Sequence, residues 1–554
     1  MQTLLAIKTQ SWLIWFLRGV VTLGFLVLAG RLVDLQIIRG KYFRVLAEEN
    51  RIRRVVIVAP RGRIFARGGE VITDNGQVQK EVVFEKSGIE KHDAETSEST
   101  KSLITEWVRT YPQADVFAHL TGYLGEVSQE ELGKVEAQCL EKGPRKLGAL
   151  IGRGGLEEKY DCTLRGIDGE ELIEVDAFGE RVRTLGRKNP TPGRDIHTTI
   201  DFGLQKKLAE MLKSDVGAAV ITDPKGEILA FYSSPSYDPN VFNNEAKQKE
   251  AEEILTDEKK PLFNRVIGGK YHPGSVFKPV VAVAALEEEK IDGSFTYEDN
   301  GYIAIKSVYG DFTFNNWYFT QYGGREGTID LERAITRSTD TFFYQIGELT
   351  GVEKIADWSH TFGLDEVTGI DIPGEIAGLV PNPVWKVRVK AERWFLGNTY
   401  HLSIGQGDIA LTPIAVNQAI AAISNGGEYC SPHILNEEAF AGNFLCRDLG
   451  IKKENIDLVK KGMVGACSLG GTGYTFFDFK EKSGYEVGCK TGTAEVGDGT
   501  DDTHAWFTAF APKDDPEIIA TILVERGGEG SRVAGPIARE IFNYYFKVPP
   551  ANDR

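Results

Sequence analysis

Hydrophobic and polar positions divide the chain into segments of different character. From Trp12 to Val33 nearly every position is apolar, over about the length of a helix that spans a lipid bilayer. Residues 164–197 alternate over short stretches typical of strands and hairpins, and SQEELG at residues 128–133 has the pattern of a helix start. A Pro and Gly cluster at 190–193 marks a boundary. The pattern predicts a membrane helix at 12–33, a β-rich part at 34–196 and a larger domain at 197–554.

The apolar N-terminal segment contains two arginines, Arg18 and Arg31. We expect Arg18 to extend its side chain to a membrane surface, or the span to begin near Gly19 and run to Ile38. A cleaved signal peptide would need a shorter apolar core and a small-residue cleavage site. A buried helix of a soluble domain is the remaining alternative. Basic residues flank both ends of the segment, so the positive-inside rule alone does not place the larger domain.

The part that starts near residue 197 predicts strands at both of its ends and helices between them. GAAVITDPKGEILAFYS, from Gly217, is typical of a hairpin with a turn at Asp223–Gly226. The middle is largely helical and includes an Ala-rich stretch at 409–424. Near the C-terminus YEVGCKTGTAEV, HAWFTAFAP and EIIATILVER indicate three strands, and VAGPIAREIFNYYF a final helix. We therefore expect an α+β domain with a five-stranded antiparallel sheet flanked by helices.

Charge and cysteine usage narrow the class of protein. The 554-residue chain has a formal net charge of −16, which argues against a nucleic-acid partner, because such binding relies on Lys and Arg contacts to phosphates. No two cysteines form a C-x-x-C pair, so neither a structural zinc site nor a thioredoxin-like motif is expected. One or two disulfides and free buried thiols are both open for the six cysteines, Cys139, Cys162, Cys430, Cys446, Cys467 and Cys489.

A serine and a lysine three residues apart stand at the start of an apolar run, in HPGSVFKPVVAVAAL. Pro279 is tolerated only in or near a first helical turn, so a helix must begin close to Ser275 and place Lys278 on the same face. Apolar surroundings and a helix N-terminus disfavour an ammonium ion, so Lys278 can act as a base that activates Ser275. The alternative is that Ser275 caps a core helix and Lys278 extends to solvent.

Two later stretches carry further candidates. ITRSTDTFFYQIG places Ser338 and Asp340 at the head of another apolar run, where Ser338 could equally be a helix cap. GCKTGTAEV indicates a strand whose glycine lets another backbone approach closely, or else a strand with a bulge. Its lysine and threonines can hold a carboxylate, and an open strand edge can bind an extended peptide. The four candidates in this strand are Lys490, Thr491, Gly492 and Thr493. The order S-x-x-K, S-x-(N or D), K-(T or S)-G is that of penicillin-binding proteins and class A β-lactamases.

On these motifs the chain resembles the class B penicillin-binding proteins, the monofunctional peptidoglycan D,D-transpeptidases. The likeness runs from APRGRIF at residues 59–65 through GLEEKYDCTLRGIDGEE to the C-terminal strands. Within the class the chain is most similar to the elongation-type branch, penicillin-binding protein 2. Two stretches resemble that branch: TDPKGEILAFYSSPSYDPNVFN and LSIGQGDIALTPIAVNQAIAAISNGG. So does Asp340, where division-type members usually carry Asn.

The resemblance implies a role for each candidate. Ser275 would attack the carbonyl between two terminal D-alanines of a stem peptide, and Lys278 would take its proton. The backbone N–H groups of Ser275 and Thr493 would form the oxyanion hole. Ser338, with Lys490 behind it, would relay a proton to the departing D-alanine, and the two threonines of the K-T-G-T motif would hold the terminal carboxylate. The acyl group would pass to an amine on a neighbouring strand, and β-lactams would acylate the same serine. Because Asp340 is acceptor-only, its charge would tend to keep a nearby lysine protonated.

The resemblance also implies an organisation for the whole chain. A cytoplasmic tail at 1–11 would precede a single transmembrane helix at 12–33. A pedestal of the dimerisation type would occupy 34–196, with a shortened head between Arg67 and Tyr111. The transpeptidase domain at 197–554 would lie outside the cytoplasmic membrane. The expected partners are stem peptides with a D-Ala-D-Ala donor and an amine acceptor, β-lactams, and a membrane glycosyltransferase of the elongation machinery.

No cofactor is expected. Some elongation-type members bind zinc near the site through Cys, His and Asp, but residues 287–337 contain neither Cys nor His, so we predict no such metal. Two other functions share the motifs: a D,D-carboxypeptidase, in which water takes the acyl group, and a scaffold that activates a glycosyltransferase with little catalysis of its own. A β-lactamase would need a carboxylate that activates a deacylating water, and we identify none.

Overall fold

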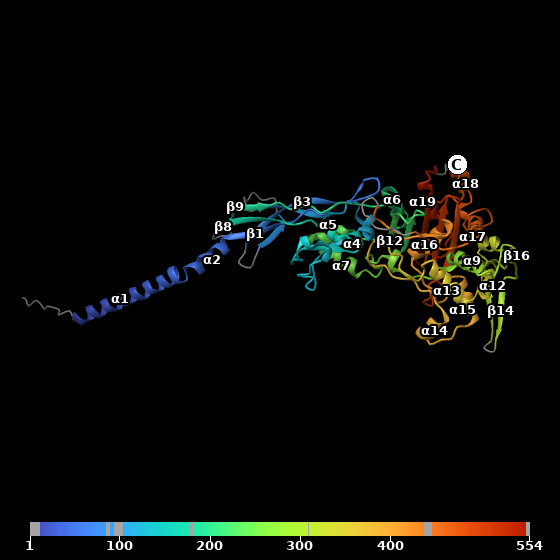
Figure 1. Ribbon diagram of the computed structural model, residues 1–554, viewed down its shortest axis with the longest axis horizontal. Coiled ribbons are helices and arrows are strands. Elements are labelled where there is room, and N and C mark those ends of the chain that lie inside the picture. The colour runs from blue at the N-terminus through green and yellow to red at the C-terminus, as the bar shows by residue number, and fades with distance from the viewer. Residues whose placement is uncertain are drawn as a thin grey trace, which may run out of the picture. The chain divides into compact units, whose positions relative to one another are not determined.

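The computed structural model of the chain describes residues 11–84, 89–93, 103–176, 181–307, 310–436 and 446–549 (Figure 1). The chain forms two compact units, each built from several segments. The first comprises Met1–Pro60, Gly76–Val108 and Gly166–Pro192, and the second Arg61–Asn75, Arg109–Arg165 and Gly193–Arg554. Apart from its last residue, the predicted cytoplasmic tail at 1–11 lies outside the described residues.

The first unit begins with the predicted apolar helix. Helix α1 (Ser11–Val33) continues through a π-helical turn at Asp34–Ile38 into α2 (Gly40–Arg51). The stretch Trp12–Ile38 is long and apolar enough to cross a membrane, and none of its most apolar window is buried inside the protein. The alternative of a buried helix of a soluble domain is therefore wrong. This stretch includes the predicted residues 12–33. It extends to Ile38, the end expected for a span that begins near Gly19.

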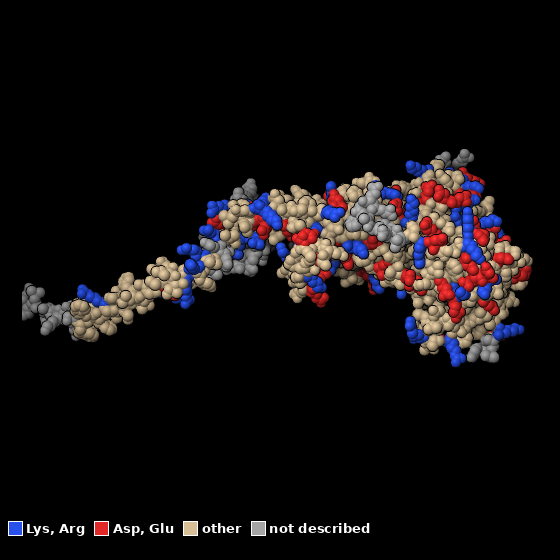
Figure 2. All heavy atoms as spheres, viewed as in Figure 1, with Lys and Arg blue, Asp and Glu red and all other residues tan. Residues whose placement is uncertain are grey.

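The rest of the first unit is β-rich, as predicted. Strand β1 (Ile52–Ile57) pairs antiparallel with β8 (Gly169–Val175), which pairs with β9 (Arg181–Lys188). The last residues of β3 (Val71–Phe84) pair with β4 (Ile89–Asp93), and β5 (Leu103–Thr110) also pairs with β3. Basic side chains gather over β1, β8 and β9 on the face that Figure 2 shows.

A five-stranded antiparallel sheet forms the centre of the second unit, as the sequence predicts. Its strand order is β12-β11-β21-β20-β19. Adjacent residues on β20 point to opposite faces, so that Trp506 packs in one apolar core and Phe507 in the other. Strand β21 is buried along its whole length, which explains its uninterrupted apolar sequence. The five strands are β11 (Gly217–Thr222), β12 (Ile228–Ser234), β19 (Gly488–Glu495), β20 (Thr503–Ala511) and β21 (Ile518–Val524).

Helices cover both faces of this sheet. Helices α6 (Phe202–Leu212) and α19 (Ala534–Tyr545) pack against each other and on one face. The core on the other face contains α9 (Lys278–Glu287) and α16 (Pro413–Ser424), whose labels lie close together in Figure 1. It is completed by α11 (Leu331–Arg337), α12 (Asp340–Thr350), α13 (Val352–Thr361) and α17 (Lys453–Ala466).

The second unit also contains shorter elements. They are β2 (Ile64–Phe65), α3 (Ala118–Thr121), β6 (Tyr123–Glu126), β7 (Leu150–Arg153), α4 (Gly155–Lys159), α5 (Asp161–Leu164), β10 (Ile196–His197), α7 (Gln248–Thr256), α8 (Arg265–Gly268), β13 (Thr296–Asp299), β14 (Tyr302–Ser307), β15 (Gly310–Asn315), α10 (Trp317–Tyr322), β16 (Gly327–Asp330), α14 (Pro383–Lys390), α15 (Leu396–Ser403), β17 (Glu428–Cys430), β18 (Cys446–Asp448) and α18 (Phe479–Ser483).

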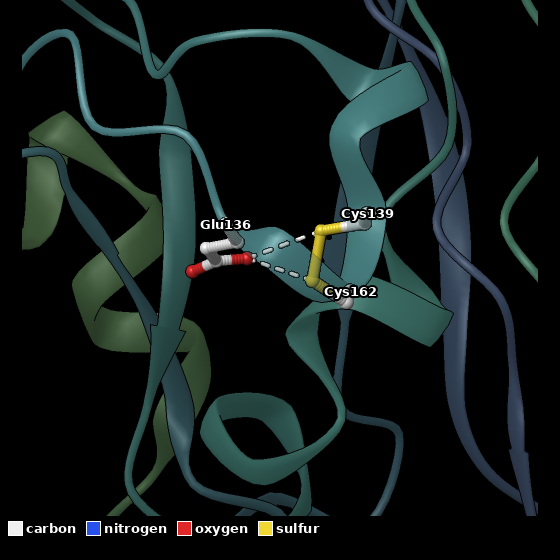
Figure 3. Close-up of side chains that lie close together, drawn as sticks. All are labelled: Glu136, Cys139 and Cys162. Carbon is white, nitrogen blue, oxygen red and sulfur yellow. Dashed lines mark hydrogen bonds between the residues drawn. A yellow bond between two sulfur atoms is a disulfide. The ribbon is translucent and has the colours of Figure 1, made fainter.

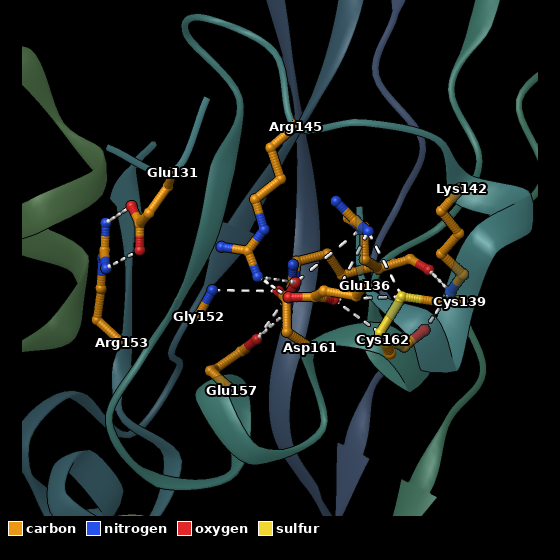
Figure 4. A network of polar contacts seen from close by, with 12 residues as sticks. Glu131, Glu136, Cys139, Lys142, Arg145, Gly152, Arg153, Glu157, Asp161 and Cys162 are labelled. Atoms are coloured by element: carbon orange, nitrogen blue, oxygen red, sulfur yellow. Dashed lines mark hydrogen bonds and ion pairs between the residues drawn. A yellow bond between two sulfur atoms is a disulfide. The ribbon is translucent and has the colours of Figure 1, made fainter. Parts of the chain in front are cut away.

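A network of ion pairs holds the segments around residues 131–165 together (Figure 4). The side chain of Glu157 is fully buried and accepts hydrogen bonds from Arg109 Nε at 2.6 Å and Arg61 Nε at 3.0 Å. Arg61 also contacts Asp161 at 2.9 Å. Because removing one partner would leave a buried charge uncompensated, this network fixes how the segments meet.

The helix start predicted at residues 128–133 is wrong, because these residues form turns. Glu131 does reach back to the backbone N–H of Ser128 at 2.9 Å, as in a capping box, but it also forms an ion pair with Arg153 at 2.7 Å. Gly133 then adopts a φ of 74°, which ends the turn before a helix can continue.

All six cysteines are paired, so free thiols are absent and the disulfides number three rather than one or two. The bonds are Cys139–Cys162, Cys430–Cys446 and Cys467–Cys489. The second joins facing residues of β17 and β18, and the third joins the end of α17 to β19. Figure 3 shows Glu136 beside the first bond, where its carboxylate lies 2.8 Å from Cys162 Sγ. Since both sulfur atoms are oxidised, this group offers no thiolate to a metal.

Candidate active site

Ser275 lies where the sequence places it, at the start of a helix. It belongs to a single 3₁₀ turn, Gly274–Phe277, which leads directly into α9 at Lys278. Pro279 is the second residue of α9, where the missing N–H removes no helical hydrogen bond. The turn therefore presents Ser275 at the N-terminal end of a helix that is buried in the core.

Lys278 does not extend to solvent, because its side chain is 0% exposed. Its Nζ lies 2.7 Å from Oδ1 of Asp340 and donates to the backbone oxygen of Ser338 at 2.8 Å and to its Oγ at 3.2 Å. The ring of Phe343 lies below the ammonium group, 5.1 Å away. Within the described residues no hydrogen bond joins Lys278 Nζ to Ser275 Oγ. The lysine is held instead by Ser338 and Asp340, the residues of the S-x-(N or D) motif.

Ser338 combines an unusual backbone with a central position. It ends α11 with φ 57° and ψ 38°, a left-handed conformation that costs free energy for a residue with a Cβ atom. In this conformation Oγ lies 3.2 Å from Lys278 Nζ and 2.8 Å from Lys490 Nζ. Ser338 is thus the C-cap of α11 and not the N-cap of α12, so the predicted alternative of a cap at the head of that run is wrong, and its hydroxyl links the two lysines.

The two lysines sit in different electrostatic surroundings. Burial lowers the pKa of Lys278, and Asp340 opposes that effect. Burial also holds the pKa of Lys490 well below its usual range, and the neighbouring charge of Lys278 lowers it further. Both amines therefore hold a proton less tightly than an exposed lysine does, Lys490 the less tightly of the two, and each can exchange a proton with the Ser338 hydroxyl.

The K-T-G-T stretch lies on β19, an edge strand of the sheet, as predicted. A Cβ atom on Gly492 would lie 3.0 Å from the carbonyl oxygen of Pro273, and a Cβ on Gly274 would lie 3.0 Å from the carbonyl oxygen of Thr493. The glycines therefore let the turn that carries Ser275 pack directly on β19. Thr493 is exposed at this edge, whereas Thr491 is buried.

Sequence reasoning missed three residues that complete the site. Thr472 accepts a hydrogen bond from Thr491 Oγ1 at 2.9 Å, and Gln406 donates to the carbonyl oxygen of Thr493 at 3.3 Å. The backbone N–H of Trp317 donates to Oδ2 of Asp340 at 2.9 Å. Gln406 and Thr472 each stand next to glycines, in GQG and GTG, which is the only local signal that they carry.

Comparisons with known proteins agree with this geometry. Residues 217–543 match the family model of the penicillin-binding protein transpeptidase domain, and residues 100–198 match that of the penicillin-binding protein dimerisation domain. The peptidoglycan D,D-transpeptidase MrdA of Acinetobacter baumannii is 31% identical over 97% of this chain and 88% of that protein.

Two solved structures are similar over most of their length. The Helicobacter pylori penicillin-binding protein PBP2, solved in a complex with MreC, is 25% identical with a TM-score of 0.75, covering 90% of this chain and 99% of that one. A chain from a structure titled "Structural coordination of polymerization and crosslinking by a peptidoglycan synthase complex" is 26% identical with a TM-score of 0.76, covering 98% of this chain and 99% of that one.

The fold, the order of the motifs and these matches together define the class. The chain belongs to the family of penicillin-binding proteins with a transpeptidase domain. Its activity is that of a peptidoglycan D,D-transpeptidase, and the α+β transpeptidase fold with its N-terminal apolar helix is confirmed.

Proposed function

We propose that the chain cross-links peptidoglycan through an acyl-enzyme on Ser275. Oγ of Ser275 attacks the carbonyl carbon of the penultimate D-alanine, and its proton passes to the neutral amine of Lys278. The backbone N–H groups of Ser275 and Thr493 stabilise the oxyanion that forms. When the C–N bond breaks, the Ser338 hydroxyl, with Lys490 behind it, gives a proton to the leaving D-alanine and regains the proton that Lys278 took from Ser275. The single observation that carries this proposal is the Ser338 Oγ between two buried lysine amines.

The edge of β19 supports a binding mode for the donor peptide. An extended stem peptide would add to this edge as a further strand, and its terminal carboxylate would be held by Thr491 and Thr493. Thr472 contacts the Thr491 hydroxyl and would fix its orientation. An amine of a neighbouring stem peptide would then attack the acyl-enzyme, forming the cross-link and releasing Ser275. β-Lactams would acylate the same serine.

For the whole chain we propose a single-pass protein of the cytoplasmic membrane. The apolar helix at 12–33 would anchor it, the tail at 1–11 would remain inside, and the catalytic domain at 197–554 would lie outside. Residues 34–196 would form the pedestal, with a reduced head. The solved complexes of similar proteins support a role in cell elongation with a membrane glycosyltransferase as partner.

The test is the mass of the intact full-length protein in detergent after incubation with benzylpenicillin. We expect a stable adduct on the wild type and none on Ser275→Ala. Release of D-alanine from a pentapeptide, with and without an added amine acceptor, then separates a transpeptidase from a carboxypeptidase. A wild type without adduct and without drug hydrolysis would overturn the acyl-enzyme and favour the scaffold.

A further inference from the structure

We propose that a buried hydrogen-bonded cluster, formed by Asp299, Asn316 and Thr341, positions Asp340 and thereby Lys278 for acylation of Ser275. This proposal rests on the proposed acyl-enzyme mechanism and adds three positioning residues to it. None of the three belongs to a motif that the sequence identifies. We call this cluster of Asp299, Asn316 and Thr341 the aspartate hub.

Asp299 is the centre of the aspartate hub. It is 1% exposed, and its carboxylate accepts four hydrogen bonds from four separate stretches of chain. Oδ1 accepts from Thr341 Oγ1 at 2.7 Å and from the backbone N–H of Gly301 at 2.9 Å. Oδ2 accepts from Asn316 Nδ2 at 3.2 Å and from the backbone N–H of Glu326 at 2.9 Å. The carboxylate thus holds four stretches of chain together. Each of these bonds is stronger than a bond between neutral groups, because a hydrogen bond to a carboxylate is charge-assisted.

Asn316 connects the hub to Asp340. It is 0% exposed, and its Oδ1 accepts from the backbone N–H of Asp340 at 3.2 Å. The next residue, Trp317, donates its own backbone N–H to Oδ2 of Asp340 at 2.9 Å. Both the backbone and one carboxylate oxygen of Asp340 are therefore held from residues 316 and 317, which aims the other oxygen at Lys278.

Thr341 connects the hub to α12 from the other side. It follows Asp340 directly, and its fully buried hydroxyl donates to Asp299. The first turn of α12 is thus attached to the hub at two successive residues. This attachment matters because, among the described residues, Asp340 is the single carboxylate within ion-pair distance of Lys278 Nζ. A shift of about 1 Å in a catalytic group can cost a hundred-fold in rate.

A second branch of the hub reaches Ser338. The side chain of Glu326, whose backbone contacts Asp299, accepts from Arg337 Nε at 2.7 Å. Arg337 precedes Ser338, and its carbonyl oxygen accepts from Trp317 Nε1 at 3.0 Å. The strained backbone of Ser338 is therefore braced by the same segments that hold Asp340.

If the hub positions Asp340, its loss should change the pH dependence of acylation, which a merely structural role would leave unchanged. The groups that face Lys278 Nζ are Asp340 from α12, Lys490 from β19, the hydroxyl of Ser338 and the ring of Phe343. If Asp340 moves away, Lys278 loses the negative charge that raises its pKa. Burial then lowers the pKa of Lys278 further. The acidic limb of the acylation rate then moves to lower pH while the rate constant decreases.

Thr341→Val tests the hub in the full-length protein, because it removes one hydroxyl and keeps the shape of the side chain. Stopped-flow acylation by a fluorescent penicillin, from pH 5 to 10, separates the acylation rate constant from the affinity for the drug. We expect the rate constant to fall by about ten- to a hundred-fold, the affinity to stay unchanged, and the acidic limb to shift to lower pH. Thr341→Ser should restore all three.

Thr350→Val is the matched control, since Thr350 is a buried threonine of the same helix whose hydroxyl donates to the carbonyl oxygen of Ile346 at 2.7 Å and, within the described part of the chain, to no group of the site. It should lower the Tm as much as Thr341→Val does and leave the rate and its pH profile unchanged. Asn316→Asp is the second variant; it keeps the acceptor for Asp340 but sets a second carboxylate against Asp299. The proposal is overturned if Thr341→Val and Asn316→Asp acylate like Thr350→Val. An adduct on Ser275→Ala would instead overturn the proposed nucleophile.

Discussion

Lys278 and Asp340 form a buried ion pair, with 2.7 Å between Nζ and Oδ1, while Lys490 has no carboxylate within ion-pair distance among the described residues. Both lysines nevertheless contact the same oxygen, Oγ of Ser338. The site therefore contains two amines and one carboxylate, and the charge of Asp340 raises the pKa of Lys278 against the effect of its burial.

Asp340→Asn should change the pH dependence of acylation. Removing the carboxylate charge removes the interaction that raises the pKa of Lys278, so burial lowers it further. Because Lys278 acts as a base in its neutral form, acylation rises with pH through that pKa. The acidic limb should therefore move to lower pH in a profile of the acylation rate constant. Asp330→Asn, at the N-cap of α11, should leave the limb in place. A limb that stays put or moves to higher pH in Asp340→Asn contradicts the base role of Lys278.

Gly492→Ala should separate the turn that carries Ser275 from β19. The added Cβ would lie 2.9 Å from Trp506 Cβ and 3.0 Å from the carbonyl oxygen of Pro273, so one of the two must move. We expect acylation to fall by about ten- to a hundred-fold and stability by about 1–3 kcal/mol, measured by penicillin labelling and thermal unfolding. Gly186→Ala on β9 meets nothing within 4 Å and is the control. Unchanged labelling of Gly492→Ala would show that the close approach is not required.

The parts of the site that the sequence predicts are those with local signals. Ser275 is found from a Pro-Gly turn before an apolar run, and Lys490 from a glycine inside a strand pattern, because spacing along one element fixes which side chains share a face. The same holds for the sheet, since the apolar strands at both ends of the domain require each other for burial.

Other features depend on which distant segments meet, and local pattern does not carry that information. Asn316 and Asp299 are 17 residues apart and have the appearance of ordinary loop residues until the fold brings them to Asp340. The pairing of the six cysteines likewise follows from the fold and not from their spacing. No helix starts at 128–133, because Gly133 adopts a φ of 74° there, and Glu131 also pairs with Arg153, 22 residues further along the chain.

Removing the disulfide Cys467–Cys489 should affect both stability and acylation. Cys489 precedes Lys490 on β19, and Cys467 ends α17 five residues before Thr472. Changing both cysteines to serine opens a link across 22 residues, which we expect to cost about 3 kcal/mol and to loosen the position of Lys490. The serine pair at Cys430 and Cys446, with a separation of 16 residues, should cost a similar amount and leave acylation unchanged. Thermal unfolding and penicillin labelling of both variants provide the measurement, and equal acylation in the two contradicts a positioning role.

His119 should make the protein less stable at acidic pH. The ring is buried, one nitrogen lies 2.8 Å from the carbonyl oxygen of Pro261, and burial lowers its pKa from 6.5 to about 4, with the charge of Arg265 as a further cause. The unfolded chain therefore binds a proton at a higher pH than the folded one. The stabilisation is fully present above pH 6.5 and is lost as the pH falls toward 4, to a total of about 3 kcal/mol.

The variant His119→Gln isolates this contribution of His119. In thermal unfolding from pH 7 to pH 4, the Tm of the wild type should fall more steeply than that of the variant, because only the wild type takes up this proton on unfolding. His360→Gln removes an exposed histidine and serves as the control, with a slope like that of the wild type. Parallel curves for the wild type and His119→Gln would contradict this prediction. They would mean that the ring binds its proton at the same pH in the folded and unfolded states, because the hydrogen bond to the carbonyl of Pro261 offsets the effect of burial on its pKa.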